Sequence, residues 1–135
     1  MRLTTAMLAD SAQVSGGKLF VLGGAFDTIG SRTFPLMHRG LTVVLVAEIG
    51  PGDRNRDLEI VIRLLDEDGA EMGIESKGSM RVGTPSSLPA GATSLIPLAV
   101  PFAGLRFPEP GGYVFIVDHD DQELARIPFR VRKIR

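Results

Sequence analysis

The chain contains 135 residues, of which 44% are hydrophobic and 23% charged, with 16 glycines, nine prolines and no cysteine. This length and composition predict one globular domain over residues 1–135. They exclude an intrinsically disordered chain, a disulfide scaffold and a cysteine nucleophile. The formal net charge of −1 also excludes a basic field over the whole molecule, so nucleic acid is a disfavoured partner.

The start of the chain lacks the features of a targeting signal, and no segment is long enough to cross a membrane. The first ten residues, MRLTTAMLAD, are too short and too polar for a secretory signal. The longest mainly aliphatic run, residues 41–47, falls well below the roughly 18 residues of a membrane span. Together with the absence of cysteine, this favours a cytoplasmic protein with no membrane partner.

Apolar residues alternate along most of the chain with a period of two, which is the period of a β-strand. The predicted strands cover residues 3–9, 18–29, 41–49, 58–65, 74–82, 95–102, 113–117 and 126–132. Turns at residues 15–17, 66–69 and 119–122 predict hairpins, and the aperiodic residues 83–94 predict a long loop. No segment has helical periodicity. The sequence therefore predicts an all-β fold, an antiparallel β-sandwich of seven to nine strands.

The strand over residues 41–49 is apolar on both of its faces. Leu41, Val43 and Leu45 share one face, and Val44 and Val46 lie on the other. This pattern predicts a central strand. Because one face of a sandwich cannot hide so much apolar surface, we expect the protein to form a homo-oligomer.

The end of the chain resembles the last two strands of many immunoglobulin-like sandwiches. A Pro/Gly turn at residues 108–112 leads into a strand that starts at Tyr113, followed by a tight hairpin and a closing strand. The cysteine and tryptophan of true immunoglobulin domains are absent, so the resemblance implies an immunoglobulin-like architecture alone. Pro128 in the closing strand predicts an edge position or a bulge, because proline cannot donate to a strand ladder.

Four segments spread over the chain resemble a bacterial family of small single-domain β proteins of unknown function. Members of that family open with a leucine-alanine-aspartate turn, then a glycine-lysine-leucine strand and a glycine pair. Here TAMLAD occupies residues 5–10 and GKLFVLGG residues 17–24; RLLDEDG at 63–69 and PFRV at 128–131 also fit. The resemblance implies a single bacterial β-domain and brings no catalytic residues with it.

The strongest surface feature of the sequence is a row of arginines in the closing strand. Arg126, Arg130 and Arg132 should project from one face of that strand, opposite its apolar residues. Such a row can bind a phosphate backbone or another anionic partner. It is also typical of a solvated strand face that pairs with nearby carboxylates and discourages edge pairing.

A metal or catalytic site has weaker support. Asp118, Asp120 and Asp121 surround His119 and could contribute to a cation site, although aspartates are equally typical of a hairpin tip. The only other histidine, His38, is expected as a partly exposed residue at a strand end. The sequence contains no nucleophile elbow and no phosphate loop, so no cofactor is expected. The phenylalanines are expected in the core, with Phe102 and Phe107 left ambiguous between core and surface.

The leading hypothesis is a non-enzymatic interaction or structural module that self-associates or binds a protein partner, because sandwich edges are templates for strand addition. A second hypothesis is an anion- or nucleic-acid-binding module that uses Arg126, Arg130 and Arg132. A third is a hydrolase or other metal-dependent enzyme built on the acidic tip at residues 118–121.

Overall fold

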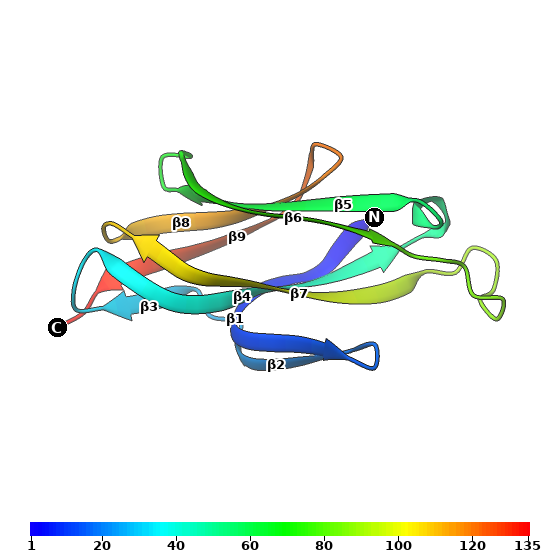
Figure 1. Cartoon of the computed structure of the whole chain (residues 1–135), viewed down its shortest axis with the longest axis horizontal. Helices are drawn as coiled ribbons and strands as arrows, with labels where there is room; N and C mark the ends of the chain where they lie inside the picture. Colours follow the sequence, from blue (N-terminus) through cyan, green and yellow to red (C-terminus); the bar gives the residue numbers. More distant parts are fainter.

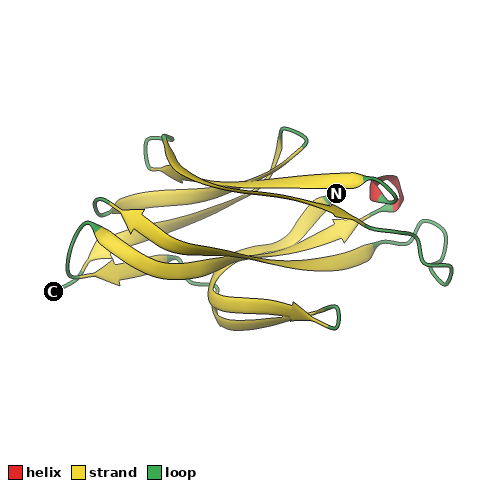
Figure 2. Ribbon diagram, viewed as in Figure 1, coloured by secondary structure: helices red, strands yellow, loops and turns green.

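The structure, a computed structural model, describes residues 1–135 and consists of nine strands and one short 3-10 turn. The elements in chain order are β1 (Arg2–Ser15), β2 (Lys18–Gly24), β3 (Thr28–Ser31), β4 (Leu36–Ile49), η1 (Pro51–Asp53), β5 (Asp57–Asp66), β6 (Glu71–Arg81), β7 (Ser94–Phe107), β8 (Gly111–His119) and β9 (Gln122–Lys133). Strands make up nearly the whole molecule (Figure 2). No helix of the chain has the length and apolar character needed to cross a membrane.

The strands form two sheets packed face to face, which confirms the predicted β-sandwich. One sheet has four strands in the order β2-β1-β4-β7, and the other has five in the order β3-β9-β8-β5-β6. All pairings are antiparallel except that of β3 with β9, which is parallel. In Figure 1, β5 and β6 lie above β4 and β7, and the β1–β2 hairpin lies below them.

The predicted strand over residues 18–29 is two strands in two different sheets. Gly23 and Ala25 have φ angles of 62° and 63°, values that extended backbone does not adopt, and the chain leaves β1 there. The following residues form β3, whose Thr28 pairs with Arg130 of β9 in the opposite sheet. Apolar residues stand on both sides of the break, and Leu19 to Leu22 are apolar at every position, so no interrupted alternation marks it.

The predicted central position of residues 41–49 is confirmed, since β4 pairs with β1 on one side and with β7 on the other. Leu41, Val43 and Leu45 belong to the core between the sheets. Val44, on the other face, is also fully buried. The β1–β2 hairpin folds back beneath this face (Figure 1). As a result β2 comes close to β7, although β1 and β4 lie between these two strands in the sheet order. The face that led us to expect an oligomer is therefore covered within one chain.

Aromatic side chains join the two sheets. Phe115 of β8 lies with its ring centroid 5.1 Å from that of Phe102 in β7 and 5.6 Å from that of Phe129 in β9. Phe102 and Phe107, which were ambiguous in the sequence, are both buried in this core. The Tyr113 hydroxyl donates to the Glu109 carbonyl at 2.7 Å, a bond to the preceding turn that resembles the tyrosine corner of immunoglobulin-like sandwiches.

Pro128 lies in a strand that is flanked on both sides, but at a position that β3 does not reach, which agrees with the predicted edge position for this residue. β9 is flanked by β8 and β3, and the one register shift in the β8–β9 pair falls between Val117 and Asp118, away from the proline. The pairing of β3 with β9 begins only at Arg130. Pro128 therefore has no neighbour on the β3 side, and its missing N–H leaves no ladder bond unmade.

Candidate interaction surface

Each sheet of the sandwich ends in two strands that pair on one side only. These free edges are β2 and β7 in the four-stranded sheet and β3 and β6 in the five-stranded sheet. An unpaired strand edge presents backbone N–H and C=O groups that can pair with another chain. Natural proteins therefore protect such edges with prolines, charges, bulges or very short strands.

Three of the four edges carry such protection. β7 has prolines at positions 97 and 101, which cannot donate to an added strand. β6 carries Glu75, Lys77 and Arg81 on its outward face and begins with a register irregularity opposite residues 63–65. β3 is only four residues long.

The edge of β2 is the least protected of the four. Its sequence, KLFVLGG, contains no proline and has one charge, at Lys18. Phe20 is 53% exposed and Leu22 is 73% exposed, so two large apolar side chains stand beside the unpaired backbone. The expectation that the phenylalanines lie in the core is wrong for Phe20.

The segment contains a sequence signal for this surface, although the strand pattern did not reveal it. Leu19, Phe20, Val21 and Leu22 are apolar at every position, and a strand next to two tight turns cannot bury both of its faces. In the structure Val21 packs toward Met7 and Gly24, while Phe20 and Leu22 face away. The way the hairpin folds back decides which face of β2 is exposed, and this cannot be read from the local sequence.

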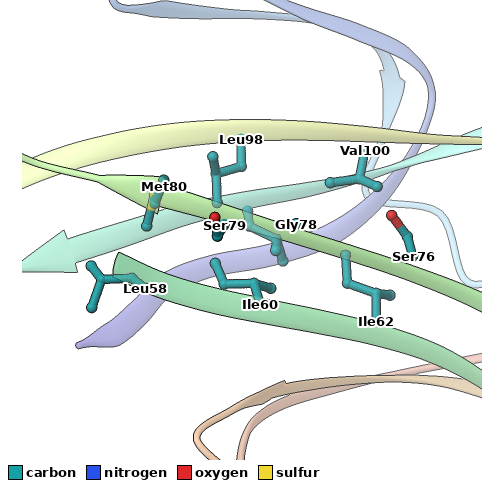
Figure 3. A pocket seen from close by; sticks show the side chains of 10 residues that line it. Leu58, Ile60, Ile62, Ser76, Gly78, Ser79, Met80, Leu98 and Val100 are labelled. Atoms are coloured by element: carbon teal, nitrogen blue, oxygen red, sulfur yellow. The ribbon is translucent and has the colours of Figure 1, made fainter. Parts of the chain in front are cut away.

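A small apolar cleft opens between the sheets beside the edges of β6 and β7 (Figure 3). Side chains of β5 and β7, such as Ile60 and Leu98, form its walls, and β6 contributes Ser76 and Gly78. The inward positions of β6 are too small here to fill the space. The cleft has a volume of about 140 Å³, below the roughly 300–1,000 Å³ of typical ligand pockets, and contains no charged side chain. It is a gap in packing rather than a site with chemistry.

The three predicted arginines do lie on one face of the closing strand. Arg126, Arg130 and Arg132 alternate with buried residues and are all exposed. Arg126 is already paired, since its Nε donates to both carboxylate oxygens of Glu123 at 3.0 Å. Arg130 lines a shallow hollow together with Asp27 and Glu67. These carboxylates weaken the attraction of this face for an anion.

The acidic tip does not gather its side chains around one point. Asp118 accepts an ion-pair hydrogen bond from Arg63 Nη2 at 2.9 Å, and Asp120 Oδ2 lies 3.2 Å from His119 Nε2. Asp120 and Asp121 form the predicted hairpin turn, with φ angles of 49° and 61°. No group of three or more histidine, aspartate or glutamate side chains is placed to hold a metal ion.

The two histidines have structural surroundings. His38 is partly exposed, as expected, and its Nδ1 accepts the Gly40 N–H at 3.1 Å. Burial lowers the pKa of His38, and the negative charge of Asp10 opposes this shift. His119 Nδ1 lies 2.9 Å from the Glu59 carbonyl oxygen. Neither histidine makes a hydrogen bond to a serine or threonine hydroxyl, the contact that a base needs to activate a nucleophile.

A comparison with protein families identifies the chain's relatives. The model of a family of unknown function, DUF6941, matches residues 4–132. The chain belongs to this family. Membership agrees with the expected uncharacterised domain family, while the bacterial origin inferred from the four segments stays a prediction.

Comparisons beyond the family add little. No curated protein matches the chain. A solved structure of a β-glucuronidase from glycoside hydrolase family 2 is similar over 72% of this chain, with 12% sequence identity and a TM-score of 0.34. The chain spans only 10% of the length of that enzyme.

Proposed function

We propose that this member of the family is a non-enzymatic protein-interaction module whose binding surface is the free edge of β2. The observation that carries the proposal is that the least protected outer strand edge also bears two exposed apolar side chains, Phe20 and Leu22. Strand addition supplies backbone hydrogen bonds, and the apolar side chains supply contact area.

Position and composition both support this surface. The β1–β2 hairpin lies on the outer side of the four-stranded sheet, away from β5 and β6 (Figure 1). Strand β2 itself carries a single charge, Lys18, so a partner strand would have few charged groups to desolvate. A cytoplasmic location is part of the proposal, favoured by the cysteine-free composition, and cell fractionation tests it.

The test is affinity purification of the tagged chain from its native host, with washes at low and then high salt. We expect the wild-type chain to retain a protein in stoichiometric amount at high salt, because apolar contacts and buried backbone bonds resist screening. Leu22→Glu should lose this protein, since the change places a charge in the interface. Met37→Glu is the matched control, because Met37 is 62% exposed on β4 and lies outside β2.

Two outcomes would overturn the proposal. One is that no protein, including another copy of the chain, remains with the wild-type protein. The other is that Leu22→Glu retains the same protein as Met37→Glu. If the retained material is instead nucleic acid released by salt, the arginine row is favoured, and Arg130→Ala with Arg132→Ala should abolish its retention.

A further inference from the structure

Building on the proposed function, we propose that the partner of β2 is β2 of a second copy of this chain. The two strands pair antiparallel about Val21, so that the four-stranded sheets of two copies join into one continuous sheet. This is an isologous contact, in which the same edge of each copy contributes equally.

The backbone of β2 is suited to this arrangement. β1 and β2 are joined by the two-residue turn Gly16-Gly17, with φ angles of 59° and 73°, and Ser15 pairs with Lys18 next to the turn. In such a hairpin the residues that close the turn exchange hydrogen bonds, and hydrogen-bonded pairs then alternate along the ladder. The N–H and C=O groups of Leu19 and Val21 therefore point away from β1, toward the free edge.

A two-fold axis through the Val21 pair places matching side chains opposite each other. Counting outward from Val21, Phe20 of one copy faces Leu22 of the second copy, and the symmetric contact repeats on the other side. By the alternation above, this is a non-hydrogen-bonded pair, in which opposite side chains approach most closely. The two most exposed apolar residues of the edge would thus cover one another.

The charges of β2 also fit a second copy. Lys18 is the only charged residue of the strand, and the same register places it opposite Gly24 of the second copy. No two like charges face each other across the contact. The same operation at β6 would bring a strand with four charged residues, Glu71, Glu75, Lys77 and Arg81, against itself, and at β7 it would meet two prolines.

The experiment is a charge exchange that reports the register. The variants Phe20→Glu and Leu22→Lys are prepared separately, and mass is measured by size exclusion with light scattering over a concentration series. We expect the wild-type chain to have twice the monomer mass, and each variant alone to dissociate at concentrations at least tenfold higher than wild type. An equimolar mixture of the two variants should recover the dimer, because the carboxylate introduced at position 20 of one chain then faces the ammonium group introduced at position 22 of the other.

Two controls separate this register from general effects of charge. A mixture of Phe20→Glu with Met37→Lys should not rescue the association of the Phe20→Glu chain, because residue 37 lies on β4. Thermal unfolding should show that both β2 variants remain folded, since the replaced side chains are mostly exposed. A variant that fails to fold is replaced by Phe20→Gln or Leu22→Gln, which should weaken the dimer without the charge rescue.

The inference is overturned if the wild-type chain is a monomer at all concentrations. It is also overturned if dimers persist in both charged variants, or if the mixture fails to restore them. A monomeric chain that still captures a different protein through Leu22 would remove this inference and leave the proposed function standing. Loss of both association and capture would remove the two together.

Discussion

The side chain of Asp10 in β1 lies directly over Gly23 in β2, so the two strands of the hairpin contact each other at its base. A β-carbon added at Gly23 would overlap the Asp10 carboxylate, and the glycine has a φ angle of 62°. Asp10 and Gly23 therefore approach each other closely across the hairpin. The glycine is thus explained by backbone geometry, because position 23 must adopt a left-handed conformation beneath a neighbouring side chain.

Gly23→Ala should lower the free energy of unfolding by about 1–2 kcal/mol, the usual cost of left-handed backbone in a residue with a β-carbon. Denaturant unfolding measures the change. Gly78→Ala is the control, because an added β-carbon there meets no atom within 4 Å and its φ angle is ordinary. The prediction is wrong if both substitutions have the same effect.

His38 should make the stability of the protein depend on pH below neutrality. Its pKa in the folded state is lowered by burial, against the opposing charge of Asp10, so the unfolded chain binds a proton more readily. Stability is therefore lost as pH falls below the unfolded value of about 6.5. Thermal unfolding between pH 7.5 and 5.5 should show a falling midpoint. In His38→Gln the fall should be smaller, and an unchanged pH profile in that variant would contradict this account.

At the scale of elements, a buried arginine holds the long loop over residues 83–94. Arg54 follows η1, and its guanidinium donates to the Gly83 carbonyl at 2.8 Å and to Ser94 Oγ at 2.6 Å, the two ends of the loop. Asn55 adds a bond from its side-chain amide to Thr84 Oγ1 at 3.0 Å. The loop is therefore fastened at its base, although it has no periodic structure of its own.

Arg54→Ala should release this loop and lower stability by about 1.5–3 kcal/mol, the range for hydrogen bonds made by charged groups. Limited proteolysis should then cut within residues 83–94 faster than in the wild type. Arg56→Ala is a matched control, since Arg56 is half exposed and its Nη2 lies 3.6 Å from Asp53 Oδ1, without contact to the loop. Equal cleavage rates in the two variants would exclude the clamp.

The strand predictions show which elements the sequence could locate. Residues 41–49 and 58–65 form strands as predicted, because each alternates strongly and ends at a turn. Residues 18–29 do not form one strand, because the chain turns at the left-handed residues Gly23 and Ala25. Apolar residues stand on both sides of this turn, so hydrophobicity did not mark it. Nothing in the local sequence marks Arg54 as a buried residue, because its partners lie 29 and 40 residues away along the chain.

At the scale of the whole molecule, one aromatic cluster ties the two sheets into a cooperative unit. Phe115→Ala should lower the free energy of unfolding by about 3–5 kcal/mol, because the side chain is fully buried between Phe102 and Phe129. Met37→Ala, at an exposed position, should change it by about 0.5 kcal/mol or less. Unfolding should follow a single transition in both, as expected for one domain; two separate transitions would show that the sheets unfold independently.

The sequence by itself determined that this chain is an all-β sandwich with residues 41–49 at its centre, because alternation and turn residues are local properties. It also indicated the outward row of Arg126, Arg130 and Arg132 and the hairpin at residues 119–122, for the same reason. Only the tertiary structure decided that Arg126 is paired, that the outer face of β4 is covered by the hairpin, and that β2 is the outer strand with the least protected edge. An edge is defined by the absence of a neighbouring strand, and which strands become neighbours is decided by contacts between residues far apart in the chain.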